Sequence, residues 1–258
     1  MKSIAVFNQK GGVGKTTSVV NIAAFLEKKY GKKVLVVDCD SQCNTTDYLM
    51  INYDEPAKYT VTSFLKKKKK AKDIAVRALV EYRGKIRETE IYLIPGDMGV
   101  DMVNIKDTGI MKKMLDEVRD GYDYCLFDCP ANLSNMTLCT LSAADYVIVP
   151  ATPAASSLKG YGLLLDTVQQ IRAADNVGLK IMGVFFNFVD SNRTLAEYII
   201  ENNKEALGTT VFETTIRRSE DMLHAEMYGR PICYYRPRRP VAKDYEKLTE
   251  EILSRMGE

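Results

Sequence analysis

One short segment near the N-terminus constrains this chain more than any other feature, and it reads Lys10-Gly11-Gly12-Val13-Gly14-Lys15-Thr16-Thr17. It follows an apolar run at residues 3–8 and opens the stretch Thr16–Lys29, whose apolar residues recur at close to helical spacing. Glycines placed between a strand and a helix are the context that a phosphate-binding loop, or P-loop, requires. Glycine lets backbone N–H groups turn toward phosphate oxygens, and the helix N-terminus adds a positive dipole.

The side chains of this loop predict how a nucleoside triphosphate would be held. Lys15 would reach the β and γ phosphates, and the Thr16 hydroxyl would bind Mg²⁺. The alternative is a glycine-rich turn without a ligand, but such a turn would need neither this charge nor this hydroxyl. The predicted nucleotide-binding residues of the loop are Gly11, Gly12, Val13, Gly14, Lys15, Thr16 and Thr17.

The loop departs from the ordinary pattern G-x-x-x-x-G-K-[ST] at its start. The first glycine would fall at Gln9, and a second lysine, Lys10, follows it. A lysine side chain in a phosphate loop has no packing role and must point at an anion. In this respect the chain resembles the deviant Walker-A ATPases, whose signature is K-G-G-x-G-K-[ST]-T. The resemblance implies ATP as the nucleotide and a catalytic role for Lys15. It also implies that Lys10, likewise catalytic, crosses the interface of an ATP-sandwich dimer to the partner's nucleotide.

Two carboxylates lie at the end of the second apolar run, where the chain reads Val37-Asp38-Cys39-Asp40-Ser41-Gln42-Cys43-Asn44. Ligands of open α/β sheets bind beyond the carboxyl ends of the strands, so these side chains should face the phosphate loop. The stretch resembles the family's D-x-D-P-Q-x-N segment, with Ser41 in the proline position. By that resemblance Asp40 orients or activates the attacking water. For Asp38, a cap at the end of the strand is an equally good interpretation.

A second acidic motif ends the run Tyr122–Phe127, where Asp128-Cys129-Pro130 follows. An apolar strand ending in Asp is the Walker-B pattern, whose carboxylate holds Mg²⁺ directly or through water. Alone this pattern is weak. Downstream of a P-loop it predicts Asp128 as a metal-site residue together with Thr16, and residues 128–135 as a switch that senses the γ-phosphate.

The spacing of apolar runs predicts a doubly wound α/β fold, with a mostly parallel sheet and helices on both faces. Several runs are continuous rather than alternating, which suits parallel strands covered on both sides. No internal repeat or Pro/Gly linker divides the chain, so residues 1–258 are predicted to form a single P-loop ATPase domain. The least regular region is 52–90. The predicted strands are 3–8, 33–38, 91–94, 123–128, 145–150, 180–187 and 209–212, and the predicted helices are Thr16–Lys29, 157–173, 195–207 and 241–256.

Within the superfamily the chain is most similar to the small ParA/Soj-type partition ATPases, because its phosphate loop begins at residue 10 with no preceding domain. The resemblance implies an ATP-dependent homodimer that binds nonspecific DNA and is stimulated by a ParB-like protein. It also implies a cytoplasmic, nucleoid-associated protein. Asn187, at the end of the sixth predicted strand, is a candidate contact for the adenine.

Two basic zones of the sequence are alternative candidates for the DNA-binding surface. Resemblance favours Arg193, Arg217 and Arg218, which stand near ordered helices in the C-terminal half. Composition favours the lysine run Lys66–Lys70, although a solvated charge run is the ordinary interpretation of such a segment. We predict that the arginines carry the DNA contact, with binding that falls steeply as salt rises.

Composition excludes several other classes. The 258 residues carry a net charge of +2 and 46% hydrophobic residues, with no apolar stretch of transmembrane length and no signal peptide, so we expect a cytoplasmic protein. The six cysteines are scattered, and Cys129 and Cys139 lack the glycine-rich setting of an iron–sulfur cluster. A MinD-like protein would end in a basic amphipathic helix, whereas residues 245–256 are acidic and mixed, so no membrane contact is expected. A MinD-like or adaptor-type ATPase that positions a non-DNA cargo remains the alternative.

Overall fold

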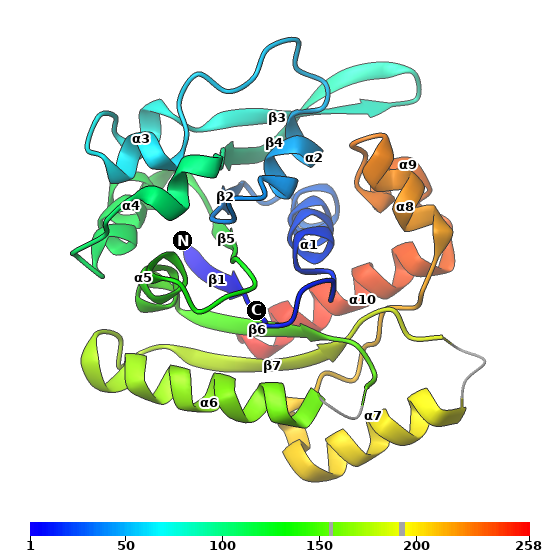
Figure 1. Ribbon diagram of the computed structural model, residues 1–258. Helices are drawn as coiled ribbons and strands as arrows, with labels where there is room; N and C mark the ends of the chain where they lie inside the picture. The colour runs from blue at the N-terminus through cyan, green and yellow to red at the C-terminus, as the bar shows by residue number, and fades with distance from the viewer. Residues whose placement is uncertain (155–156, 191–193) are drawn as a thin grey trace.

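The computed structural model describes residues 1–154, 157–190 and 194–258 of the chain (Figure 1). Its centre is a seven-stranded sheet with the order β3-β4-β2-β5-β1-β6-β7. Every pair of neighbouring strands is parallel except β3 and β4, which are antiparallel at one edge. The strands are β1 (Lys2–Val6), β2 (Val34–Asp38), β3 (Val76–Tyr82), β4 (Lys85–Ile94), β5 (Tyr124–Asp128), β6 (Tyr146–Ala151) and β7 (Lys180–Phe186).

Helices cover both faces of this sheet (Figure 1). They are α1 (Lys15–Tyr30), α2 (Asn44–Met50), α3 (Val61–Leu65), α4 (Ile110–Val118), α5 (Asn135–Ala143), α6 (Ser157–Ala174), α7 (Thr194–Leu207), α8 (Glu220–Met227), α9 (Ile232–Tyr235) and α10 (Pro240–Arg255). Short 3₁₀ turns lie at η1 (Ala71–Asp73), η2 (Met98–Met102), η3 (Arg119–Gly121) and η4 (Gly208–Thr210). None of the helices within these described ranges is long and apolar enough to cross a membrane.

The two cores follow from the alternation of side chains along each strand. In β1, Ile4 and Val6 point to a core shared with α1, α2 and α8–α10, whereas Ala5, and Phe7 just after the strand, point to one shared with α3–α7. Both faces of the strand are therefore buried, which explains why its sequence is a continuous apolar run. The apolar side of α10, including Tyr245 and Leu248, is buried in the first of these cores. The predicted fold class is confirmed, and the single domain over 1–258 stays a prediction.

The prediction of a strand at 209–212 is wrong. Residues 208–210 form the turn η4, and Val211 makes only an isolated bridge to Val184. The turn begins at Gly208 with φ +57°, a left-handed backbone that does not continue a strand. The edge strand β3 lay unassigned within 52–90, because it is half exposed and partly polar on both sides.

Candidate nucleotide site

The glycine-rich loop stands at the carboxyl end of β1, between β5 and β6. Gly12 and Gly14 have φ values of +70° and +85°, the left-handed backbone that glycine adopts at little cost. Nothing lies within 4 Å of where a Cβ would stand on Gly11 or Gly12, so the loop borders open space. The helix α1 then begins at Lys15, and its N-terminal N–H groups face this edge of the sheet. The loop has the open, N–H-lined form that accepts phosphates.

The two lysines of the loop are placed differently. Lys15 is only 8% exposed and lies within the site, whereas Lys10 is exposed. The Lys10 backbone N–H donates to Asn8 Oδ1 at 2.9 Å, and Asn8 Nδ2 donates to the Pro150 carbonyl oxygen at 2.8 Å. The start of the loop is thus tied to β6. The Lys10 ammonium lies 3.4 Å from the Thr152 hydroxyl at the surface, where a second chain could reach it.

Asp128 is the buried carboxylate of the site. Its Oδ2 accepts hydrogen bonds from the hydroxyls of Thr16, at 2.7 Å, and Thr45, at 2.6 Å. Its Oδ1 is buried and has no hydrogen-bond partner among the described residues. Burial raises the pKa of Asp128 to about 6, although the two hydroxyls and the charge of Lys15 act in the opposite direction.

These residues fit a magnesium ion. An unpartnered carboxylate oxygen beside a P-loop hydroxyl offers the oxygen ligands that Mg²⁺ prefers, and Mg²⁺ commonly takes one or two carboxylates plus substrate phosphates. No group of three or more His, Cys, Asp or Glu side chains placed to hold a metal occurs in the part of the chain that the structure describes. The arrangement therefore suits a metal that is completed by phosphate and water, with Thr16 and Asp128 as the protein side chains.

Asp38 and Asp40 have different surroundings. Asp38 is fully buried beside Asp128 in the β2–β5 pairing, and it accepts hydrogen bonds from Thr46 N at 2.9 Å, Thr46 Oγ1 at 2.6 Å and Asp40 N at 3.2 Å. Burial, and then the charge of Asp128, raises the pKa of Asp38 to about 7. Asp38 therefore holds the strand end and the start of α2, as a capping carboxylate does. Asp40 is only half-buried, and its Oδ1 accepts from Gln42 N at 3.0 Å.

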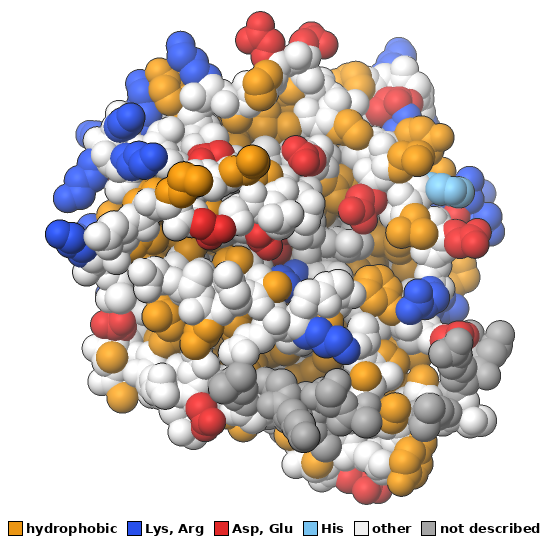
Figure 2. Space-filling model, in the orientation of Figure 1, with side chains coloured by type: hydrophobic (Ala, Val, Ile, Leu, Met, Phe, Trp, Pro, Cys, Tyr) orange, Lys and Arg blue, Asp and Glu red, His pale blue; other side chains and the backbone are white. Residues whose placement is uncertain are grey.

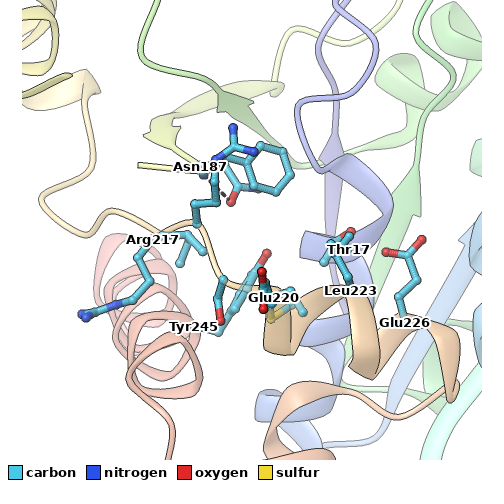
Figure 3. A pocket seen from close by; sticks show the side chains of 12 residues that line it. Thr17, Asn187, Arg217, Glu220, Leu223, Glu226 and Tyr245 are labelled. Atoms are coloured by element: carbon cyan, nitrogen blue, oxygen red, sulfur yellow. Dashed lines mark hydrogen bonds between the residues drawn. The ribbon is translucent and has the colours of Figure 1, made fainter. Parts of the chain in front are cut away.

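A cavity of about 320 Å³ adjoins the loop on the α8 and α10 side (Figure 3). Asn187 is buried at its edge, donating to the Val13 carbonyl oxygen at 3.1 Å and accepting from Phe188 N at 2.9 Å. A Cβ built on Gly14 would overlap the Asn187 amide. Asn187 thus fixes the position of the phosphate loop. The cavity is lined by Thr17, Asn187, Phe188, Ile216, Arg217, Arg218, Ser219, Glu220, Met222, Leu223, Glu226 and Tyr245.

The predicted arginine pair borders this cavity. The Arg217 guanidinium points away from Thr17 toward α10 (Figure 3), where its Nε and Nη2 donate to the Asp244 carboxylate at 2.6 and 2.9 Å. This bidentate contact raises the pKa of Arg217. Arg218 is exposed, with its guanidinium carbon 5.7 Å from the centre of the Phe188 ring. Arg193 lies outside the described residues.

Comparisons with known proteins match this site and fold. A family model described as an AAA domain matches residues 1–181. The chromosome-partitioning ATPase Soj of Treponema pallidum is 35% identical over 264 residues, which span 100% of this chain and 99% of that protein. The sporulation initiation inhibitor protein Soj of Bacillus subtilis is 35% identical over 259 residues, which span 98% of each chain. The chain belongs to the ParA/Soj family.

The fold of this ParA/Soj-family chain also occurs in a solved structure of a protein that is named as a synthase. Cobyrinic acid a,c-diamide synthase from Mycobacterium smegmatis, solved with bound ADP and magnesium, superposes with a TM-score of 0.80 at 24% identity. The superposition covers 100% of this chain and 96% of that one. At this identity the likeness concerns the fold alone.

Most residues of the site in this ParA/Soj-family chain were predicted from the sequence, but four that make contacts there were not. The structure brings the loop residues 11–17 together with Asp40, Asp128 and Asn187 at one edge of the sheet. The missed residues are Thr45, Thr46, Phe188 and Asp244. Two hydroxyls directly after the acidic motif were a signal for the first pair, since hydroxyls satisfy buried carboxylates. No sequence signal joins Arg217 to Asp244, which stand on separate elements.

Proposed function

We propose that this chain hydrolyses ATP with Mg²⁺, dimerises when ATP is bound, and in that state binds DNA without sequence preference. A ParB-like protein would stimulate hydrolysis, and the cycle would segregate a chromosome or plasmid. The observation that carries the proposal is the contrast within one loop, where Lys15 is buried in the site and Lys10 is exposed beside it. Relatives named chromosome-partitioning ATPases match the chain over its whole length, which supports ATP hydrolysis and a part in chromosome partitioning here.

ATP binding would use the loop and the adjoining cavity. The N–H groups of Gly11–Thr17 would surround the phosphates, and Lys15 would neutralise the β and γ charges. The base and sugar would occupy the cavity beside Asn187, where the Phe188 ring and the apolar side chain of Met222 offer contact. Asn187 is already bonded to Val13 and Phe188. Its main part would therefore be to position the loop, with adenine contact as a second role.

Hydrolysis would depend on Asp40. Its half-buried carboxylate stands at the edge of the site, free of the hydroxyl contacts that engage Asp38 and Asp128. It can therefore accept a proton from a water, or orient that water, opposite the γ-phosphate. When bound between Thr16 and Asp128, Mg²⁺ would offset the negative charge on the phosphate oxygens. Asp38 would keep α2 in place, so that Thr45 stays bonded to Asp128.

Dimerisation would use Lys10. In the described ranges its ammonium has a hydrogen-bond partner in the Thr152 hydroxyl, at 3.4 Å, and no carboxylate partner. An exposed cation at the mouth of a phosphate site is attracted to the charge of a nucleotide held by a second copy. That attraction needs a bound nucleotide and is strongest for a triphosphate, which favours the dimer when ATP is bound.

DNA binding would be electrostatic, because phosphate contacts supply affinity without sequence preference. Arg218 is exposed and available, whereas Arg217 is engaged by Asp244. Arg193 belongs to the same proposed set. A dimer would double the cations that one duplex meets, and the protein would lie on the nucleoid in the cytoplasm. The alternative, an ATP-switched adaptor for a non-DNA cargo, predicts the same dimer without DNA binding.

The proposal is tested by measuring ATP turnover and solution mass for the wild type, for Lys10→Ala and for Lys72→Ala. Lys72 is exposed and lies on the turn η1, so its variant is a matched loss of one charge. We expect Lys10→Ala to bind ATP yet stay monomeric and hydrolyse slowly, whereas Lys72→Ala behaves as the wild type. An ATP-bound dimer of normal mass in Lys10→Ala would refute the role of Lys10. No turnover by the wild type with Mg²⁺ would refute the ATPase proposal.

A further inference from the structure

The groove beside β3 is strongly basic. Its volume is about 620 Å³, and it lies between the β3–β4 turn and the segment joining α9 to α10. We call it the arginine groove. Its lining contains five arginines, three tyrosines and no carboxylate: Tyr82, Arg83, Gly84, Arg230, Tyr234, Tyr235, Arg236, Pro237, Arg238 and Arg239.

The turn between β3 and β4 presents one of these arginines at its tip. Tyr82 pairs with Lys85, so Arg83 and Gly84 form a two-residue connection, with φ values of +54° and +74°. Positive φ at both positions is the type I′ geometry, which favours Asn, Asp or Gly at the first of them. An arginine there adopts a conformation that few non-glycine residues occupy. The chain thus carries a long cation at a position where a small residue would fit more easily.

Aromatic rings hold several guanidinium groups in place. The guanidinium carbons of Arg83 and Arg87 lie 5.2 and 5.4 Å from the centre of the Tyr82 ring. On the opposite wall, that of Arg236 lies 5.1 Å from the centre of the Tyr235 ring. A ring orients a guanidinium without neutralising its charge, unlike a carboxylate. The contacts with Tyr82 therefore leave the N–H groups of Arg83 and Arg87 able to donate to an anion.

Carboxylates neutralise only part of this charge. Arg230 forms an ion pair with Glu81, which joins the two walls, and Asp221 is shared by Arg236, at 2.5 Å, and Arg239, at 3.2 Å. Among the lining residues, Arg83 and Arg238 have no ion pair within the ranges that the structure describes. Lys85 and Arg87, which follow on β4, have none there either. In the space-filling view, basic side chains gather over α3 and α4 and again at the opposite edge, beside α8 (Figure 2).

We infer that the arginine groove binds the phosphate backbone of a nucleic acid duplex. This inference rests on the proposed function and extends its DNA contact from Arg218 to the β3–β4 turn. The planar guanidinium fork matches phosphate in a bidentate way, and several forks in a row suit a repeating phosphate chain. Such contacts position a duplex without reading its sequence. Because Asp244 pairs with Arg217, only Arg218 of the predicted arginine pair is without an ion pair in the described residues. The groove offers two such cations, Arg83 and Arg238.

The test uses the full chain with ATP and a fluorescent duplex of arbitrary sequence, at low salt. Its variant is Arg83→Gly with Arg238→Gln, which removes two unpaired cations. Glycine favours the φ of residue 83, so the turn should keep its form. The control, Lys66→Gln with Lys68→Gln, removes two charges from the other basic zone. Thermal unfolding of each protein checks the fold.

We expect the groove variant to bind the duplex at least ~10-fold more weakly and to lower the salt slope by about 1–2, since each lost phosphate contact removes about 1. The control variant should bind the duplex less than ~3-fold more weakly than the wild type. A groove variant that binds like the wild type overturns the inference and leaves the proposed function standing. A wild type that ignores the duplex overturns both. Competition by polyglutamate that exceeds competition by unlabelled duplex would assign the groove to an acidic protein and overturn the nucleic-acid ligand.

Discussion

The substitution Gly14→Ala tests whether Asn187 fixes the phosphate loop. Gly14 has φ +85°, and a Cβ at this position would overlap the Asn187 amide and stand 3.1 Å from Phe188 Cζ. The amide must then move, and its hydrogen bond to the buried Val13 carbonyl oxygen, now 3.1 Å, is lost. The change therefore combines a strained backbone with a broken buried contact.

The two costs can be separated. A non-glycine residue in left-handed backbone costs about 1–2 kcal/mol, and a buried carbonyl left without its donor costs about 1–3 kcal/mol. Gly14→Ala should lower the free energy of unfolding by about 2–5 kcal/mol when both costs apply. In an Asn187→Ala background the amide is already absent. There the same substitution should cost only about 1–2 kcal/mol, the backbone part.

Urea unfolding without nucleotide measures this difference in cost. The four proteins are the wild type, Gly14→Ala, Asn187→Ala and the double variant. We expect a coupling free energy of about 1–3 kcal/mol between the two positions. The slope of the unfolding free energy against urea concentration should be the same for all four proteins. Equal slopes mean that the substitutions have not changed the compactness of the unfolded state. If Gly14→Ala lowers the free energy of unfolding equally in both backgrounds, the hydrogen bond from Asn187 to Val13 does not fix the loop.

Three further predictions concern nucleotide binding, hydrolysis and stability. Lys15→Ala should abolish ATP binding in a calorimetric titration, because the β and γ phosphates lose their buried cation; near-normal affinity in the folded variant would remove the P-loop assignment. Asp40→Ala should bind ATP, accumulate as a dimer and release phosphate about 10²–10⁴-fold more slowly, and unchanged turnover would move the role to Asp38. Burial alone would raise the pKa of Glu251, but backbone N–H groups and Arg255 lower it below its ordinary value of 4.5. The carboxylate therefore stabilises the fold above that pH, and the stability advantage over Glu251→Gln should shrink as pH falls below about 4.5; a constant difference in urea midpoints would contradict this.

Much of the site was predictable because it is local in sequence. The loop residues and Asp128 each follow an apolar strand, and parallel strands bring their carboxyl ends to one edge. Asn187 was predicted from its position at the end of a strand alone. Its two hydrogen bonds to Val13 and Phe188 add the reason for its burial.

What the sequence could not predict depends on contacts between distant elements. Arg217 pairs with Asp244 across 27 positions, and Arg230 pairs with Glu81 across 149. Ion pairs of this kind arise from the packing of elements that are distant in sequence, which a pattern of apolar residues does not specify. The edge strand β3 was missed for a related reason. Its residues are only half-buried, so its apolar signal is weak, and pairing with β4 rather than propensity determines its form.

The central claim is that ATP converts this chain into a DNA-binding dimer. Equilibrium fluorescence anisotropy of a labelled duplex of arbitrary sequence, measured with ATP, with ADP and without nucleotide, tests it most directly. We expect tight binding with ATP only, and a linear fall of log affinity with log salt at about 0.9 per phosphate contact. Equal binding in all three nucleotide states, or none with ATP at low salt, would contradict it.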